Sequence, residues 1–317
     1  MQQALIRYMN RQKKIISVLL AFMLMLSVCS CGGGGGSAEA SEDPNAPDRD
    51  NTPVVLKTEA PGDKTFGNSD ATIDYSNVDK GYFMAQYTGS NSKVKMQVFI
   101  EDVTYSYDLS TNGNWVAFPL SLGDGEYTVG VFENISDDQY AQLFKESFSV
   151  KLDDDFGPFL HPNQFVDFDE STKAVAMSED ICKGAKSDLG AVERLFNYVT
   201  DNITYDYDKA ATVKPGYLPD IDETIQTGKG ICFDYAAVLS SMLRVQRIPC
   251  KLVIGYADDA YHSWISIYTA DTGWVDNMIE FHEDTWTRMD PTFAAAGDDS
   301  DPNLVGSGTE YNPNFFY

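Results

Sequence analysis

The sequence predicts an α+β domain at its carboxyl end, preceded by a small all-β domain, and two observations support this prediction. Between residues 69 and 153, short runs rich in β-branched and aromatic residues alternate with clusters of Gly, Asn and Asp. From residue 154 onward the apolar residues take helical spacing and then return to strand patterns. We therefore divide the folded part of the chain into 69–153 and 154–317.

The first 30 residues have the pattern of a secretion signal. A basic region that includes Arg7 and Lys14 precedes the apolar run IISVLLAFMLML, which is too short to compete well as a transmembrane span. The following VCSC resembles the lipobox of bacterial lipoproteins, which implies that Cys31 becomes the lipidated first residue. Cys29, which follows the bulky Val28, is the weaker alternative, and a plain secretion signal cleaved elsewhere is another. We expect a protein anchored through Cys31 to the outer face of the bacterial cytoplasmic membrane, or to a periplasmic face.

Residues 31–68 have the composition of a flexible tether, because they begin with GGGGGS and continue as a polar, Pro-containing and acidic stretch. The whole chain carries a net charge of −25. Removal of residues 1–30 takes away four positive charges and no negative one, which leaves −29. Such a surface repels nucleic acid, so we expect no nucleic-acid partner.

The segment 69–153 reads as an all-β domain. Its strand-like runs are GYFMAQYTG, KVKMQVFIEDV, NWVAFPLSL, GEYTVGVFENI and LFKESFSVKL. In one of them Tyr127, Val129 and Val131 alternate with smaller or polar residues. Five or more such strands predict a small Ig-like β-sandwich. We interpret it as a spacer or accessory domain, with a binding module as the alternative.

The segment 154–317 combines helices and strands. Ser187 can cap a helix through DLGAVERLFNYVTDN, and IDETIQTGKG predicts a short helix closed by glycine. CFDYAAVLSSMLRVQ predicts a central helix with a buried stripe of Ala236, Leu239, Met242 and Leu243. The runs that predict strands are CKLVIGYA, HSWISIY, GWVDNMIEF and WTRMDPTF.

Cys232 stands at the start of the central helix, just after Gly228 and Gly230. A helix N-terminus stabilises a thiolate, lowers the thiol pKa and offers N–H donors to an oxyanion. A nucleophilic thiol also needs a base and a carboxylate that orients the base. His262 begins the HSWISIY run and is the candidate base, and Asp290 in MDPTF is the candidate carboxylate.

The motifs GKGICFDYA, HSW and MDPTF, in this order, resemble the transglutaminase-like superfamily of papain-type cysteine enzymes. FNYVTDNITYD and IPCKLVIGY resemble its bacterial members, so the resemblance covers roughly residues 160 to 293. It implies a triad of Cys232, His262 and Asp290, and a papain/transglutaminase-like fold in which the catalytic helix packs on an antiparallel sheet.

The resemblance also implies an activity. The enzyme would act on an amide bond of a peptide, a protein or a cell-wall peptide through a thioester, which ends in hydrolysis or transamidation. Some members of the superfamily have lost catalysis. The alternative is therefore a catalytically silent binding or scaffold protein at the cell surface.

The chain departs from the family pattern after His262. The gap to Asp290 is long, and VDNMIEFHEDTW predicts an extra hairpin within it. Asp276 and Asp284 compete with Asp290 for the third place in the triad. As possible lining of the catalytic cleft we select Trp264, Tyr205 and Gly230.

The remaining candidate groups are interpreted as structural. No CxxC or HExxH occurs, and the calcium sites of animal transglutaminases have no counterpart here, so we expect no metal and no cofactor. Cys250 begins an apolar strand and reads as core, although a disulfide with Cys182 is an alternative. His161 and His282 read as structural and solvated, respectively. Asp234 is expected to support the helix start rather than the chemistry.

Overall fold

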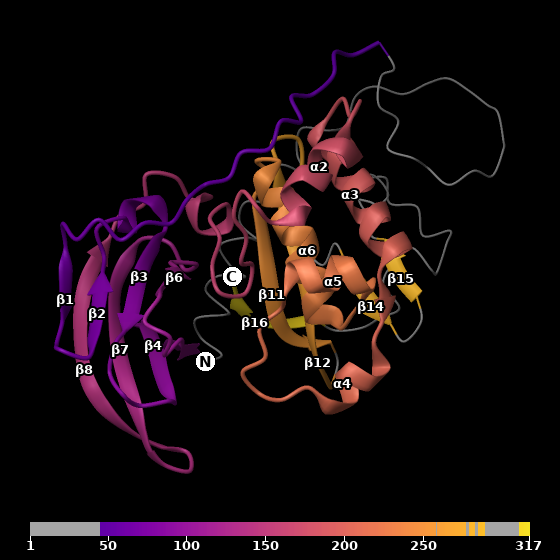
Figure 1. Ribbon diagram of the computed structural model, residues 1–317. Coiled ribbons are helices and arrows are strands. Elements are labelled where there is room, and N and C mark those ends of the chain that lie inside the picture. Colours follow the sequence, from indigo (N-terminus) through magenta and orange to yellow (C-terminus); the bar gives the residue numbers. More distant parts are fainter. Residues whose placement is uncertain (1–44, 258, 277–278, 283–284, 289–310) are drawn as a thin grey trace, which may run out of the picture.

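The computed structural model describes residues 45–257, 259–276, 279–282, 285–288 and 311–317. A β-sandwich and a domain of helices packed on a sheet lie beside each other (Figure 1). Within these described ranges, no helix is long and apolar enough to cross a membrane.

The amino-terminal part of the fold is a sandwich of two four-stranded antiparallel sheets. Its strands are β1 (Thr65–Gly67), β2 (Ala71–Asp74), β3 (Tyr82–Tyr87), β4 (Val94–Ile100), β5 (Val103–Leu109), β6 (Trp115–Pro119), β7 (Gly125–Ser136) and β8 (Gln139–Val150). One sheet has the order β1-β2-β3-β6 and the other β5-β4-β7-β8. The sheets meet through rings such as Phe83 and Phe148, whose centroids are 5.8 Å apart. The strand pattern predicted such a sandwich, although it did not mark β1, β2 or β5 as strands.

The carboxyl-terminal domain is built around helix α6 (Cys232–Val245), as the sequence predicted. Its other helices are α2 (Lys173–Cys182), α3 (Asp188–Asn202), α4 (Tyr207–Thr212) and α5 (Ile221–Thr227). The 3₁₀ turn η2 (Gly157–Phe159) precedes them, and a second one, η1 (Val78–Lys80), lies between β2 and β3 of the sandwich. The predicted caps are present: the Ser187 side chain accepts a hydrogen bond from the Gly190 N–H, and Gly228 ends α5 with φ of 62°.

An antiparallel sheet with the order β13-β12-β11-β16 packs against α6 (Figure 1). The remaining strands are β9 (Thr204–Tyr205), β10 (Lys229–Gly230), β11 (Cys250–Ala257), β12 (Ala260–Thr269), β13 (Gly273–Val275), β14 (Ile279–His282), β15 (Thr285–Arg288) and β16 (Tyr311–Phe316). The GWVDNMIEF run, expected as one strand, is divided between β13 and β14. β14 pairs with β15, which is the extra hairpin that the sequence predicted.

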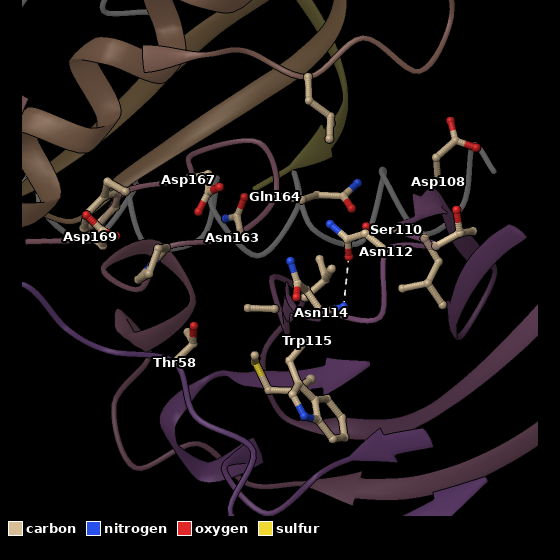
Figure 2. Close-up of a pocket in the computed structure, with 18 of the residues that line it drawn as sticks. Thr58, Asp108, Ser110, Asn112, Asn114, Trp115, Asn163, Gln164, Asp167 and Asp169 are labelled. Atoms are coloured by element: carbon tan, nitrogen blue, oxygen red, sulfur yellow. Dashed lines mark hydrogen bonds between the residues drawn. The ribbon is translucent and has the colours of Figure 1, made fainter. Parts of the chain in front are cut away.

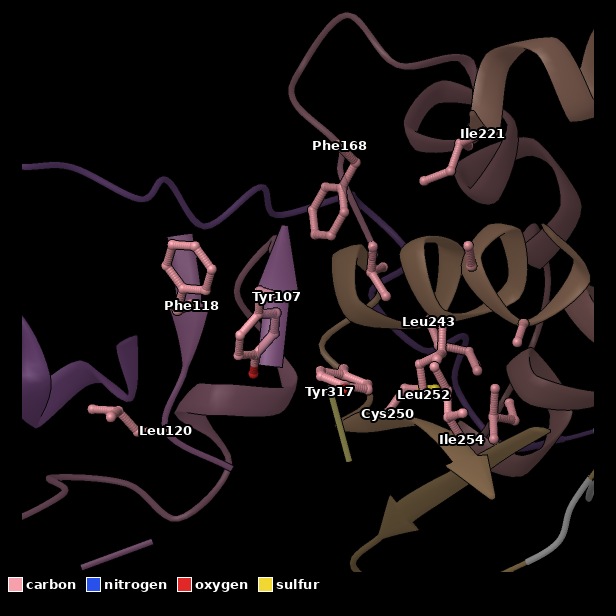
Figure 3. Packing of buried hydrophobic residues seen from close by; sticks show 14 of the residues in the cluster. Tyr107, Phe118, Leu120, Phe168, Ile221, Leu243, Cys250, Leu252, Ile254 and Tyr317 are labelled. Atoms are coloured by element: carbon pink, nitrogen blue, oxygen red, sulfur yellow. The ribbon is translucent and has the colours of Figure 1, made fainter. Parts of the chain in front are cut away.

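Aromatic rings join the sandwich to the second domain. Tyr105 and Tyr107 of β5 contact Tyr317 at centroid distances of 5.7 and 5.8 Å, and Tyr107 lies 5.7 Å from Phe165. These residues belong to one hydrophobic cluster that runs from the sandwich to the sheet beneath α6 (Figure 3). The sandwich is therefore packed against the second domain through a shared core.

Arg244, in the last turn of α6, is completely buried and binds three separate segments. Its guanidinium donates to the carbonyl oxygens of Cys250 (2.9 and 3.1 Å), His161 (2.7 Å) and Tyr317 (2.7 Å). Burial lowers the pKa of Arg244 to about 10. This side chain therefore connects α6, β11, the end of β16 and the segment between the domains.

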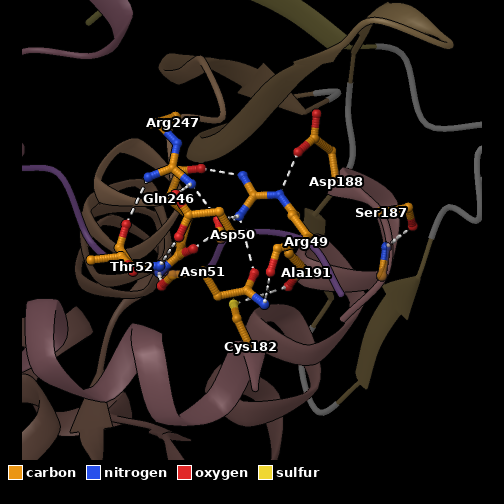
Figure 4. A network of polar contacts seen from close by, with 11 residues as sticks. Arg49, Asp50, Asn51, Thr52, Cys182, Ser187, Asp188, Ala191, Gln246 and Arg247 are labelled. Atoms are coloured by element: carbon orange, nitrogen blue, oxygen red, sulfur yellow. Dashed lines mark hydrogen bonds and ion pairs between the residues drawn. The ribbon is translucent and has the colours of Figure 1, made fainter. Parts of the chain in front are cut away.

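The expected flexible tether of residues 31–68 is wrong for the part that the structure describes. The backbone N–H groups of Arg49 and Val54 donate to the carbonyls of Ala185 and Val245, both at 2.8 Å. The Arg49 guanidinium also donates to Asp188 at 2.6 Å (Figure 4). Residues 45–64, here called the strap, have the composition of a linker, but these hydrogen bonds fix their first part on the helices, and the N–H groups of residues 59, 62 and 64 donate to side chains of the sandwich. Residues 31–44 lie outside the described ranges.

The alternative disulfide between Cys182 and Cys250 is also wrong, because both residues are buried free thiols. The Cys182 sulfur lies 3.9 Å from the Ala191 carbonyl oxygen, and the Cys250 sulfur lies 3.2 Å from the Ser240 hydroxyl. Burial raises the pKa of each thiol to about 11. Cys250 is thus a core residue of β11, as expected.

We expect Arg49→Ala to lower the free energy of unfolding by about 2 kcal/mol, because it removes largely buried, charge-assisted hydrogen bonds. The matched control is Lys57→Ala in the same strap, since Lys57 makes a solvent-exposed ion pair with Glu170 and exposed ion pairs add little to stability. Urea denaturation of both variants measures the difference. Equal effects would show that the strap contributes nothing through Arg49.

Candidate active site

The start of α6 is held by a short parallel pair of strands. β10 pairs with β9, so that Lys229 lies beside Thr204 and Gly230 beside Tyr205. A Cβ atom at Gly230 would stand 2.7 Å from the Cβ of Asp234. Glycine is required at this position because the chain passes directly against the first turn of the helix. This packing places Cys232 as the first residue of α6.

Asp234 supports the helix start, as the sequence analysis expected. Its carboxylate is completely buried and accepts a 2.8 Å hydrogen bond from the Ile231 N–H. It also pairs with the Lys209 ammonium at 2.8 Å and accepts a 2.5 Å hydrogen bond from the Tyr217 hydroxyl. Lys209 in turn lies 4.5 Å from the centre of the Tyr217 ring. The charge of the buried carboxylate is thus balanced, and an acidic group at a helix N-terminus is favourable.

The Cys232 thiol faces strand β12. The backbones of Ser263 and Phe233 and the hydroxyl of Ser263 lie close enough to the sulfur to lower the pKa of the thiol through hydrogen bonding. Burial raises the pKa of the Tyr205 and Tyr261 hydroxyls, and the nearby Cys232 sulfur adds to both rises. The thiol therefore lies between the β9 region on one side and the beginning of β12 on the other.

Burial raises the pKa of the Cys232 thiol, and Asp234 adds to the rise. The hydrogen bonds from Ser263 and Phe233 act in the opposite direction but do not reverse it. The sequence had predicted a lowered pKa from the helix N-terminus. The prediction missed that protein surrounds the sulfur closely, and desolvation disfavours the charged thiolate.

His262 precedes Ser263 on β12 and stands opposite Gly255 of β11. Its half-buried ring lies 6.3 Å from the ring of Trp264, nearly parallel to it. Successive residues of a strand point to opposite faces, so Ser263 and His262 leave the sheet on different sides. The contact between the thiol and β12 is made at Ser263, and the pairing of Cys232 with the His262 imidazole remains a prediction.

Asp290 and its competitor Asp284 lie outside the described residues, so the third member of the triad also remains a prediction. Asp276 is described, and its carboxylate interacts with Lys251 at the start of β11. Lys251 is four residues from Gly255, which corresponds to about 13 Å along a strand. Because Gly255 is the partner of His262, this position does not favour Asp276 as the group that orients the imidazole.

The structure also places the residues that were selected as cleft lining and the two remaining histidines. Trp264 is buried, packs against the Tyr311 ring at 5.2 Å and lies beneath His262. Tyr205 is half-buried beside the thiol. His161 packs against Tyr82 at 4.9 Å at the domain junction, and burial lowers its pKa. His282 lies on β14, and its side chain is outside the description.

No cluster of three or more metal-ligating side chains occurs within the described ranges. Sequence reasoning missed Lys209, Tyr217 and Ser263 as parts of this site. Ser263 is the middle residue of HSW and could have been read from its place next to His262. Lys209 and Tyr217 lie in segments without a motif, and only the fold brings them to Asp234.

Comparison with solved structures finds distant likenesses. A candidate cysteine protease from Cytophaga hutchinsonii has 14% identity and a TM-score of 0.31, with 67% of each chain covered. Red sea bream transglutaminase has 14% identity and a TM-score of 0.26, with 73% of this chain and 50% of that chain covered. At these scores the structural likenesses carry no argument about function.

Two sequence comparisons are more direct. The UPF0252 protein of Methanocaldococcus jannaschii is 35% identical over 63 residues, which is 18% of this chain and 18% of that protein. The chain therefore spans about a fifth of the curated relative that it matches. The family model described as "Transglutaminase-like superfamily" matches residues 175–291, which include the GKGICFDYA and HSW motifs. Residues 175–291 are thus similar to the transglutaminase-like superfamily.

Proposed function

We propose that this protein is a cysteine-nucleophile enzyme that acts on amide bonds of peptides or proteins through a thioester intermediate. The observation that supports it best is the position of the Cys232 thiol, at the first residue of α6 and against the β12 segment that carries His262. The family match at residues 175–291 supports the same chemistry. A catalytically silent binding protein is the alternative, and detection of an acyl-enzyme, described below, distinguishes the two.

In this proposal His262 either takes the proton from Cys232 during the attack or already holds it as an imidazolium beside a thiolate. Burial, which raises the pKa of the Cys232 thiol, favours the first course. His262 takes the proton while the sulfur forms a bond to the amide carbonyl carbon, and Asp290 holds the imidazole tautomer. The backbone N–H of Cys232 and a neighbouring donor stabilise the tetrahedral oxyanion.

The intermediate then collapses. The carbon–nitrogen bond breaks, and the imidazolium gives its proton to the leaving ammonia or amine, so that an acyl-thioester remains on Cys232. Water completes a hydrolysis, or a lysine amine completes a transamidation, and the thiol is restored. Trp264, Tyr205 and Gly230 are proposed to line the cleft that receives the substrate.

We further propose that the enzyme works at the outer face of a bacterial membrane, held there by lipid on Cys31. Its substrate would be a peptide, a protein or a cell-wall peptide within reach of that anchor. The sandwich is proposed to be Ig-like, and its shared core with the second domain supports a fixed accessory domain rather than a hinged spacer.

The first test separates catalysis from folding. We expect Cys232→Ser to lower the rate of thioester formation at least about a hundredfold, because a hydroxyl is far less acidic than a thiol. Its melting temperature should change little. Cys250→Ser is the matched control: it places a hydroxyl in the core and should cost about 1 kcal/mol of stability while turnover per folded molecule is kept. Mass spectrometry of the acyl-enzyme and thermal unfolding measure both. Full turnover in Cys232→Ser would end the enzyme proposal.

The second test uses pH. Because burial raises the pKa of Cys232, alkylation by iodoacetamide should be slow at pH 7 and rise with pH to a midpoint above the reference of about 8.5. Cys182 and Cys250, buried and with pKa values of about 11, should stay unmodified in the folded protein at pH 9. Peptide mass spectrometry identifies the labelled residue. A midpoint well below 8.5 would instead indicate a thiolate–imidazolium pair, and His262→Ala would then raise it. The silent alternative predicts the high midpoint together with no acyl-enzyme from any amide substrate.

The third test concerns the anchor. We expect Cys31→Ala to move the protein from the membrane fraction to the soluble fraction, because the lipidated residue is lost. Ser37→Ala, which lies beyond the VCSC motif, serves as a control. Immunoblots of fractionated cells measure the distribution. A Cys31→Ala variant that fractionates like the unchanged protein would contradict lipid anchoring.

A further inference from the structure

A large cavity lies between the sandwich and the second domain, separate from the residues around Cys232. Its volume is about 1120 Å³, slightly larger than the roughly 300–1,000 Å³ of a typical small-molecule site. Its walls come from the strap at 55–59, the edge strands β5 and β6 with the turn that joins them, and the loops at 162–171 and 215–218. Four segments that are far apart in the sequence thus share one concave surface (Figure 2).

Asn163 supplies the first sign of a ligand. The residue is 3% exposed, and its Oδ1 accepts hydrogen bonds from the N–H groups of Phe165 (2.9 Å) and Val166 (3.2 Å). Asn163 belongs to the cavity wall, and its Nδ2 is buried within that wall with no hydrogen-bond partner among the described residues. A buried donor without a partner costs free energy, so a small shift that lets this amide donate to an acceptor in the cavity would be favourable.

The side chains around Asn163 define the chemistry of that ligand. Figure 2 shows Asp167, Asn163 and Gln164 along one wall and Asn114 with Trp115 across from them. Solvent reaches the Asp167 carboxylate, but protein surrounds it closely, and this burial raises its pKa, as do Asp169 and Asp220. The lining therefore combines carboxamides, which both donate and accept, with a carboxylate acceptor and an indole ring.

Hydroxyl groups match this lining best, because each hydroxyl both donates and accepts a hydrogen bond. A carboxamide can bind two neighbouring hydroxyls, a carboxylate can accept from two, and an indole ring offers an apolar surface for C–H groups. A peptide would instead need a row of backbone partners. We propose that the cavity binds a saccharide chain, with Asn163 donating to one of its oxygen acceptors and Asp167 accepting from its hydroxyls.

The cavity is separated from the catalytic helix by a single layer of side chains. Phe165 and Tyr217, which belong to two of the lining loops, lie 5.6 and 6.4 Å from the ring of Phe233, the residue after Cys232. A saccharide bound here would hold the protein beside a glycan while the thiol remains accessible from elsewhere. The inference does not rest on the proposed catalysis, because binding can be measured in the Cys232→Ser variant.

The test uses isothermal titration with a tetramer of N-acetylglucosamine, with cellotetraose and with an alanine-glycine pentapeptide. Asn163→Asp keeps the Oδ1 acceptor for the loop and replaces the unpartnered donor with an oxygen. Asp167→Asn keeps the shape and removes the carboxylate. The matched control is Asp201→Asn, an exposed aspartate of α3 away from the cavity. Thermal unfolding checks that each variant is folded.

We expect at least one tetrasaccharide to bind, with affinity at least about tenfold weaker in Asn163→Asp and Asp167→Asn and unchanged in Asp201→Asn. Loss of binding in a variant that melts at the unchanged temperature would support the proposal. Binding of the pentapeptide alone would overturn it in favour of a peptide groove. It would equally be overturned if neither saccharide bound, or if both cavity variants bound saccharide as the unchanged protein does.

Discussion

The arrangement of the second domain depends on the buried guanidinium of Arg244. A cation removed from water is costly unless its donors are satisfied, and here each partner is a main-chain carbonyl on a different part of the fold. The side chain sits in the last turn of α6, where the helix macrodipole favours a positive charge. Moving β11, β16 or the junction segment away from α6 would leave this charge unpaired. The free-energy cost of leaving the Arg244 guanidinium unpaired therefore keeps the sheet and α6 in one relative position.

The opposite end of α6 is fixed by the opposite charge. Asp234 binds the Ile231 N–H, Lys209 and Tyr217. A buried carboxylate therefore stabilises the N-terminal end of α6, and a buried guanidinium stabilises its C-terminal end. The helix is therefore held at both ends against segments distant in the sequence. The position of the Cys232 thiol against Ser263 follows from this, because it depends on where the first turn of α6 begins.

The predictions for Arg49 and for thiol labelling rest on two features that could not be predicted from the sequence. These are the attachment of the strap and the raised pKa of Cys232. Periodicity and caps located α3, α5, α6, β11 and β12, because local spacing and turn residues determine them. The strap was missed because its composition is that of a linker, and the contacts that hold it, such as Arg49 with Asp188 and the Val54 N–H with the Val245 carbonyl, join residues far apart in the sequence. The direction of the Cys232 pKa was missed for a similar reason. A helix N-terminus can be read from sequence, whereas burial of the sulfur by β12 and Tyr205 depends on long-range packing.

The sandwich has more structural connections to the second domain than a spacer needs. Tyr105 and Tyr107 pack on the end of the sheet beneath α6, and the cavity beside them is formed by both domains and the strap together. A freely hinged spacer would keep no cavity of constant shape, since its walls would move apart. The shared aromatic core therefore does two things: it stabilises the sheet that carries His262, and it keeps Asn163 facing a surface of the sandwich. The fixed junction is what lets the two domains form the proposed saccharide site close to α6.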